Sequence, residues 1–115
     1  MVLVDLATAT ICFLNQCYPA LVGAETPTGQ FRLEQVRTKE PGYGGDVMLF
    51  KEIQTSVFAI HRVWLFKPQQ NRLERLASGK VSDRLAATLG CINVMPEVYD
   101  KLLDCCNGQL LTVSR

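Results

Sequence analysis

Cys91 and His61 are the residues of this chain whose types and spacing could perform covalent catalysis. A cysteine nucleophile needs a base that removes its proton or pairs with its thiolate, and histidine suits this role because its pKa lies near neutrality. Cys91 follows Gly90, where a chain reversal can expose the sulfur and free backbone N–H groups for an oxyanion. One histidine and five cysteines will always offer some such pair, so two buried side chains are the plain alternative.

The five cysteines also limit the redox and metal chemistry of the chain. An odd count leaves at least one thiol free if disulfides form within the chain. There is no C-x-x-C pair and only one histidine, so we expect no structural zinc site. Cys105 and Cys106 are adjacent, and strain argues against a bridge between them. A bridge from one of them to Cys12 or Cys17 is the alternative in an oxidising compartment, but we favour buried thiols.

The elements that must position these residues are mostly β-strands. Alternating apolar and polar residues predict strands over residues 2–6 and 10–14, with a short turn between them. QFRLEQVRT, residues 30–38, alternates apolar and charged side chains in the manner of one half-exposed strand. Two runs rich in β-branched and aromatic residues follow, VMLFKEI and SVFAIHRVWLF, residues 47–53 and 56–66.

After Pro68 the pattern changes to helix. Leu73 and Leu76 lie three residues apart among charged side chains, which predicts a short amphipathic helix. Pro96 suits the first position of a second helix, which Gly108 would end before a closing strand. We therefore predict a mainly β fold, a sandwich or partly closed sheet, with one or two short helices in the C-terminal half.

Length and charge describe one ordinary domain, which we assign to residues 1–115. A net charge of +1, from 12 basic and 11 acidic residues, gives no electrostatic reason to expect nucleic acid or an anionic membrane as a partner. No apolar run approaches the roughly 18 residues needed to span a bilayer. Asp5 interrupts the apolar N-terminus, which has no basic region, so no signal peptide is visible. A removed signal, export without one, and a cytosolic protein all stay open.

Four blocks, in order, resemble the catalytic domain of the L,D-transpeptidase (YkuD-type) family over nearly the whole chain. TPTGQF, residues 26–31, is similar to that family's TPxGxF turn, and FAIHRVW, residues 58–64, to the strand that bears its catalytic histidine. TLGCINV, residues 88–94, resembles its nucleophile motif, and MPEVYDKLL, residues 95–103, the short helix that follows. The resemblance implies an L,D-transpeptidase-like β-sandwich.

The resemblance also implies a transferase of the cell wall that acts on peptidoglycan stem peptides. Cys91 would attack the carbonyl between the third and fourth residues of a donor stem, and the terminal D-alanine would leave a thioester behind. An acceptor stem would give a 3→3 crosslink, a D-amino acid would give exchange, and water would give L,D-carboxypeptidase trimming. His61, oriented by a backbone carbonyl, would move the proton, while N–H groups around Gly90 and Cys91 would bind the oxyanion. No metal or cofactor is implied, and carbapenems are expected to acylate the cysteine.

Five further residues are candidates for the site. Arg84 suits a substrate carboxylate, because arginine binds carboxylates bidentately, although a solvated arginine paired with an acid is about as good an interpretation. Thr88 and Asn93 lie within the nucleophile block, where hydrogen bonds that hold the loop are favoured over direct contact with substrate. Trp64 and Tyr43 could line a groove for a peptide or sugar, but aromatic residues at strand ends are more often part of the core.

Two departures from the family pattern keep an alternative open. Leu89 stands where many members have a second histidine, and the segment between His61 and Cys91 is longer than is common. Both favour a non-catalytic relative that binds peptidoglycan or a protein. An active enzyme is expected in the periplasm or cell wall, either as a housekeeping enzyme whose signal lies outside this chain or as a secreted effector with an immunity protein as its partner.

Overall fold

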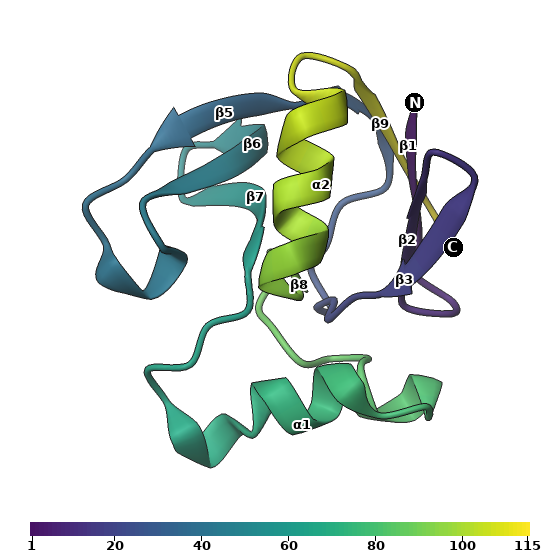
Figure 1. The fold of residues 1–115 in the computed structure, drawn as a ribbon, viewed down its shortest axis with the longest axis vertical. Helices are drawn as coiled ribbons and strands as arrows, with labels where there is room; N and C mark the ends of the chain where they lie inside the picture. Colours follow the sequence, from purple (N-terminus) through teal and green to yellow (C-terminus); the bar gives the residue numbers. More distant parts are fainter.

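The structure is a computed structural model that describes all 115 residues, and it contains two β-sheets with a helix between them (Figure 1). The first sheet has the strand order β3-β2-β1-β9-β4, and the second has the order β5-β6-β7-β8. The strands are β1 Val2–Asp5, β2 Thr10–Phe13, β3 Gln16–Pro19, β4 Gly29–Arg32, β5 Glu34–Arg37, β6 Asp46–Ile53, β7 Ser56–Arg62, β8 Ile92–Val94 and β9 Leu110–Ser114. The helices are α1 Arg72–Ala77 and α2 Pro96–Cys106, with 3-10 turns η1 Pro41–Tyr43, η2 Pro68–Gln70 and η3 Val81–Asp83. The predicted mainly β architecture is confirmed.

The core forms where both sheets pack against α2. Alternate residues of β1 and β2 are buried on the side of the first sheet, while Met48, Ile60 and Ile92 are buried on the side of the second. Tyr99 and Leu102 of α2 lie between them and are fully buried. Because one helix serves both sheets, the strands that carry the candidate catalytic residues share a single core with the rest of the chain.

The segment expected to be one strand, residues 30–38, is instead two strands in different sheets. β4 pairs with β9 in the first sheet, and β5 pairs with β6 in the second. Leu33 lies between the two strands with no exposed surface, and its backbone bonds to Gln109 and Gly108. Leu33 therefore turns inward where the chain crosses from sheet to sheet, and the polar residues on either side of it gave the appearance of one continuous alternation.

β7 and β8 are parallel neighbours, so the chain between them must cross over from one end of the sheet to the other. We call this stretch, residues 63–91, the β7–β8 connection. It contains η2, α1 and η3, and it lies beside the end of the second sheet (Figure 1). The predicted short helix is confirmed as α1, whose Leu76 is buried. The predicted strand at 56–66 ends earlier, at Arg62, where the connection begins.

Four of the five cysteines form disulfides, which corrects the expectation of buried thiols. Cys12 and Cys17 face each other in the β2–β3 hairpin and are bridged there. Cys105 and Cys106 are bridged to each other, so the argument from strain was wrong for this pair. That argument describes a penalty and not a prohibition, and the pair lies in the last turn of α2, next to the end of the helix. Cys91 is the one free cysteine.

The two helices of the chain are short. Neither is long and apolar enough to cross a membrane.

Candidate active site

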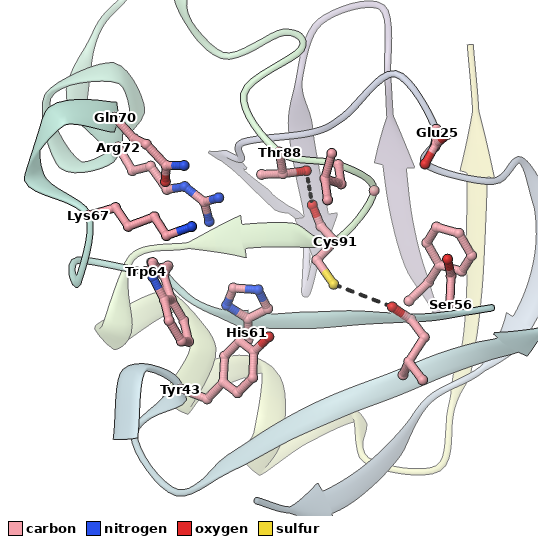
Figure 2. A pocket seen from close by; sticks show the side chains of 14 residues that line it. Glu25, Tyr43, Ser56, His61, Trp64, Lys67, Gln70, Arg72, Thr88 and Cys91 are labelled. Carbon is pink, nitrogen blue, oxygen red and sulfur yellow. Dashed lines mark hydrogen bonds between the residues drawn. The ribbon is translucent and has the colours of Figure 1, made fainter. Parts of the chain in front are cut away.

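The pairing of β7 with β8 brings His61 and Cys91 together. His61 pairs with Asn93, and Ile60 pairs with Ile92. Because side chains alternate along a strand, His61, Asn93 and Cys91 project from the same face of the sheet. His61 and Cys91 line one cleft of about 310 Å³ (Figure 2). The structure thus unites the two residues that the sequence nominated for catalysis.

Cys91 stands at the entry to β8 with its thiol half-buried. Its Sγ donates to the Val57 carbonyl at 3.7 Å, and no hydrogen bond joins it to the imidazole. Burial raises the pKa of the thiol above its ordinary 9.0, while the backbone N–H of Ala59 and the charge of Arg72 act to lower it. The resting side chain is therefore a thiol at neutral pH.

His61 is 2% exposed and is fixed by its own neighbour. Its Nδ1–H donates to the Arg62 carbonyl at 2.6 Å, which is the orientation expected from the family resemblance. This bond leaves Nε2 as the acceptor nitrogen, and the Asn93 Nδ2–H donates to it at 3.5 Å. Burial lowers the pKa of His61 to about 4, with Arg72 acting in the same direction and the Arg62 carbonyl opposing it. The imidazole is therefore neutral at pH 7 and able to accept a proton.

The loop before Cys91 leaves two backbone donors free. The N–H groups of Gly90 and Cys91 make no hydrogen bond within the chain. Gly90 is packed so closely against the Phe58 ring that a Cβ atom there would collide with it. The Thr88 hydroxyl donates to the Cys91 carbonyl at 2.6 Å, so Thr88 has a structural bond within the loop (Figure 2). The arrangement offers N–H groups beside the sulfur, as an oxyanion would require.

Thr26 supports this loop from behind, and sequence reasoning gave it no role. It is 2% exposed, accepts a bond from the Gly23 N–H at 2.9 Å and donates to the Gly90 carbonyl at 2.8 Å. The Glu25 N–H donates to the Leu89 carbonyl at 3.2 Å. Thr26 begins the TPTGQF block, so the signal was present in the sequence, but its partner lies 64 residues away.

Tyr43 and Trp64 form an aromatic wall beside His61. The Tyr43 ring lies 4.5 Å from the imidazole and 4.8 Å from the Trp64 ring, centroid to centroid. Arg62 secures the loop that carries Tyr43, because its guanidinium donates to the Tyr43 carbonyl at 3.1 Å and to Asp46 at 2.7 Å. Both aromatic residues line the cleft, as a groove for a peptide or sugar would require.

Arg84 is not brought into the cleft. It is 5% exposed, and its three nitrogens donate to the carbonyls of Ala9, Ser78 and Thr8. Its donors are already engaged within the fold, so it ties the connection to the first sheet. Asn93 is also fully buried, and it accepts bonds from the Trp64 N–H and from Arg72.

Arg72 faces the cleft in the place proposed from sequence for Arg84. Its Nη1 donates to Asn93 Oδ1 at 3.1 Å, and it lines the cleft together with Lys67 and Gln70. Nothing in the sequence separates Arg72 from the other arginines of the connection, because the difference arises from tertiary packing alone. The chain has no cluster of three or more His, Cys, Asp or Glu side chains suited to a metal ion.

A second cleft, of about 360 Å³, reaches the same residues from the outer face of the second sheet. Its apolar part is lined by Val36, Val47 and Leu49, and it shares His61 and Cys91 with the first cleft. The candidate nucleophile and base are thus accessible from two sides.

Comparison with known proteins defines the fold. No family model and no curated protein matches the chain. Among solved structures, an L,D-transpeptidase from Mycobacterium smegmatis is similar, with a TM-score of 0.62 and 17% identity over 99% of this chain and 58% of that one. A second, from Xylanimonas cellulosilytica, has a TM-score of 0.59 and 17% identity over 97% of this chain and 58% of its own. The L,D-transpeptidase LdtMt1, solved with imipenem, has a TM-score of 0.61 and 15% identity over 97% and 57%.

These similarities establish that the chain has the L,D-transpeptidase fold. The chain spans less than three fifths of the length of each of the three structures.

Proposed function

We propose that this chain is a cysteine L,D-transpeptidase that acts on peptidoglycan stem peptides. The observation that carries the proposal is the placement of Cys91 and His61 on one face of paired strands, inside a cleft of an L,D-transpeptidase fold. The free N–H groups of Gly90 and Cys91 add the donors that acyl transfer needs.

Acylation begins with the sulfur. Cys91 Sγ bonds to the carbonyl carbon of the third residue of a donor stem, and the thiol proton passes to His61 Nε2. The oxyanion of the tetrahedral intermediate accepts hydrogen bonds from the N–H groups of Gly90 and Cys91. The C–N bond then breaks, His61 returns the proton to the leaving D-alanine amine, and a thioester remains on Cys91.

Deacylation fixes the product. An acceptor amine gives a 3→3 crosslink, a free D-amino acid gives exchange, and water gives L,D-carboxypeptidase trimming. His61 accepts a proton from the attacking group, the thioester C–S bond breaks, and His61 returns the proton to Cys91 Sγ, which restores the thiol. The second cleft suits the acceptor, because it reaches Cys91 without being lined by Lys67 or Arg72.

His61 acts on a thiol and not on a preformed thiolate. Burial lowers the pKa of the imidazole to about 4 and raises that of the Cys91 thiol, so the neutral pair is favoured at pH 7. Attack on the carbonyl and transfer of the proton to Nε2 therefore occur together, because a separated ion pair is disfavoured in the buried site.

Mass spectrometry after incubation with imipenem tests the proposal. We expect an acyl adduct on Cys91 in the wild type and none in Cys91→Ala, with His61→Ala slowed at least about 100-fold. LdtMt1, which has the same fold, was solved in complex with imipenem, which motivates the choice of probe. A folded protein that remains unmodified by both imipenem and a disaccharide tetrapeptide would contradict the proposal. Chromatography of muropeptides then assigns crosslinking, exchange or trimming.

A non-catalytic relative is the second candidate. Two observations favour it: Sγ bonds to the Val57 carbonyl instead of the imidazole, and Leu89 replaces the second histidine of the motif. This candidate predicts that muropeptide binds in the cleft, with an affinity that calorimetry can measure, and that no adduct forms on Cys91.

We place the protein outside the cytoplasm, in the periplasm or cell wall. Its proposed substrate is found there, and the two disulfides are in keeping with an oxidising compartment. A housekeeping enzyme and a secreted effector with an immunity protein are variants of this proposal. Toxicity on periplasmic expression, relieved by the product of a neighbouring gene, would favour the effector.

A further inference from the structure

We propose that Arg72 and Lys67 form a carboxylate-binding subsite that takes the free carboxylate of the leaving residue of the donor. This inference rests on the proposed acyl transfer at Cys91. It places the terminal residue of the donor at the Arg72 end of the cleft, and it gives the β7–β8 connection a role in selecting the donor.

The first argument is the set of hydrogen bonds that Arg72 does not make. Its Nη1 is engaged by Asn93 Oδ1, but its Nε is buried without a partner, and no bond is made by Nη2. Both ion pairs of the chain belong to Arg62, so no acidic side chain of the protein neutralises Arg72. The Nε and Nη2 edge of the guanidinium is therefore a fork with no partner inside the chain.

The second argument is that unsatisfied groups gather at this end of the cleft. Three buried side-chain atoms in the structure lack a partner, and two of them are Arg72 Nε and Gln70 Oε1. Both residues line the cleft. Buried polar atoms are normally paired, so the unpaired Arg72 Nε marks a donor that an acceptor on a ligand would satisfy, whereas the Gln70 carbonyl oxygen would need a donor group of the ligand and not its carboxylate.

The third argument is the chemistry of the fork. A guanidinium edge matches a carboxylate bidentately, and the Lys67 ammonium adds a second positive charge at the same end. Lys67, Gln70 and Arg72 lie on one side of Cys91, while Glu25 and Ser56 lie on the other (Figure 2). The cleft thus has a positive end and an acidic end, with the sulfur between them.

The reaction decides which substrate carboxylate reaches the positive end. In the proposed reaction the leaving D-alanine carries a carboxylate within one residue of the broken bond. Arg72 lies near enough to the sulfur for its charge to act on both Cys91 and Tyr43. The donor stem then runs from the Glu25 end towards Arg72, with the leaving residue next to the connection.

A pair of donors that differ only in this charge tests the subsite. The donors are a disaccharide tetrapeptide with a terminal D-alanine carboxylate and the same compound with a terminal D-alaninamide, and the readout is kcat/KM for release of the terminal residue. We expect the wild type to prefer the carboxylate by about 10- to 100-fold, the range of a charge-assisted hydrogen bond. Arg72→Met should lose this preference, and Arg72→Lys should keep part of it.

The matched control is Arg115→Met, which removes the same charge at the exposed C-terminus and should keep the wild-type preference. An Arg72→Met variant that retains the wild-type ratio between the two donors overturns the subsite, and so does a wild type that releases both residues equally. A wild type that releases neither, and takes no imipenem adduct, contradicts the proposed function instead.

A different observation carries a second inference: we infer that Thr26 is a positioning residue that aims the oxyanion donors. In a trans peptide unit the C=O and N–H groups point in opposite directions. The Glu25 N–H holds the Leu89 carbonyl, and the Thr26 hydroxyl holds the Gly90 carbonyl. The N–H groups of Gly90 and Cys91, which belong to the same two peptide units, must therefore point away from residues 25–26.

The packing leaves this arrangement little freedom. A Cβ atom at Gly23 would collide with the Thr88 carbonyl, and Thr26 Oγ1 also accepts the Gly23 N–H. Residues 23–26 thus lie directly against the back of the 88–90 loop. Thr26 touches neither the sulfur nor the imidazole, so its effect on the reaction passes through the Gly90–Cys91 peptide.

Two reagents that react with the same thiol distinguish an effect on the oxyanion donors from an effect on the thiol or on the fold. Acylation by imipenem develops an oxyanion, whereas alkylation by iodoacetamide is a direct displacement that develops none. Thr26→Val, which keeps the shape and removes the hydroxyl, should slow acylation about 10- to 100-fold and leave alkylation unchanged, since misaimed donors cost less than the roughly 100- to 1,000-fold of a deleted oxyanion donor. Thr26→Ser, which keeps the hydroxyl, should restore acylation.

Equal acylation rates for Thr26→Val and the wild type overturn the positioning role. A parallel loss of acylation and alkylation overturns it as well, because the substitution would then act on the thiol or on the fold. If the wild type is alkylated but never acylated, the proposed function fails before Thr26 is tested.

Discussion

Two arginines of the β7–β8 connection, Arg72 and Arg84, differ in the partners of their side-chain donors. Arg84 is buried, and all three of its nitrogens bond to backbone carbonyls. Arg72 lines the cleft, uses one nitrogen on Asn93 and has no partner for its Nε or its Nη2. Arg84 is therefore a structural residue whose donors are all bonded within the fold, while Arg72 keeps donors that a ligand could use.

Replacing Arg84 should give the larger effect on stability. Arg84→Met removes three hydrogen bonds to backbone carbonyls, of which only the Ala9 carbonyl keeps another partner, the Ala20 N–H, so we expect the free energy of unfolding to fall by about 3 kcal/mol. Arg72→Met removes one bond and should lower it by about 1 kcal/mol or less. Urea denaturation followed by circular dichroism measures both values. Equal losses of unfolding free energy in the two variants would contradict the proposed difference between Arg84 and Arg72.

Acid should destabilise the protein through His61, and Arg72 should strengthen this effect. The pKa of His61 is about 4 in the folded state against 6.5 ordinarily, so between these pH values the unfolded chain binds the extra proton. Stability present above pH 6.5 is therefore lost as the pH falls towards 4, by about 3 kcal/mol.

Denaturation curves at pH 7 and pH 4 measure this loss, and His61→Gln removes it. Because the charge of Arg72 contributes to the lowered pKa, Arg72→Met should reduce the loss. Arg84→Lys should leave it unchanged, since Arg84 is not among the groups that shift His61. A pH dependence that is identical in wild type and His61→Gln contradicts the assignment.

The rate at which Cys91 is alkylated should also depend on Arg72 and not on Arg84, with a smaller effect. Burial raises the pKa of the thiol above 9.0 and Arg72 opposes that rise, so alkylation should keep increasing into the alkaline range. Arg72→Met should move the midpoint of the rate profile to higher pH, whereas Arg84→Lys should not. Iodoacetamide rates from pH 6 to pH 10.5 measure the profile. A plateau reached near pH 7 would instead indicate a preformed ion pair with His61.

Restoring the missing motif histidine should have the smallest effect. The Leu89 side chain is 85% exposed, and the loop is held through the Leu89 carbonyl and not through its side chain. We therefore expect Leu89→His to change the acylation rate by about twofold or less. A gain of tenfold or more, measured with imipenem, would show that this position takes part in proton transfer.

The sequence predicted the parts of the site that depend on local order. Cys91 and His61 could be nominated because each lies within its own recognisable block, and the strands and helices around them follow from periodicity and from Pro96. The crossing at Leu33 was missed because a buried residue between two exposed strands has the same alternation as one strand. Periodicity records which face is polar but not which sheet the strand joins.

The parts that were missed depend on contacts between distant segments. Arg72 and Arg84 lie on the same short stretch, and only packing decides which one is enclosed by carbonyls. Thr26 bonds to Gly90, which lies 64 residues further along the chain. Neither the TPTGQF block nor the TLGCINV block, taken by itself, indicates that the two are in contact. The adjacent disulfide at Cys105 and Cys106 was misjudged because a general penalty was treated as a prohibition.

The hydrogen bonds between β7 and β8 fix the spacing between the proposed base and the proposed nucleophile. Neighbouring strands lie about 4.8 Å apart whatever chain joins their ends, so the base and the nucleophile keep their spacing independently of the connection. The connection can therefore be treated as an exchangeable part in protein engineering. A segment of different length or charge in place of residues 66–77, which keeps Arg84, would alter which donors are accepted while the Cys91–His61 geometry stays as the sheet sets it.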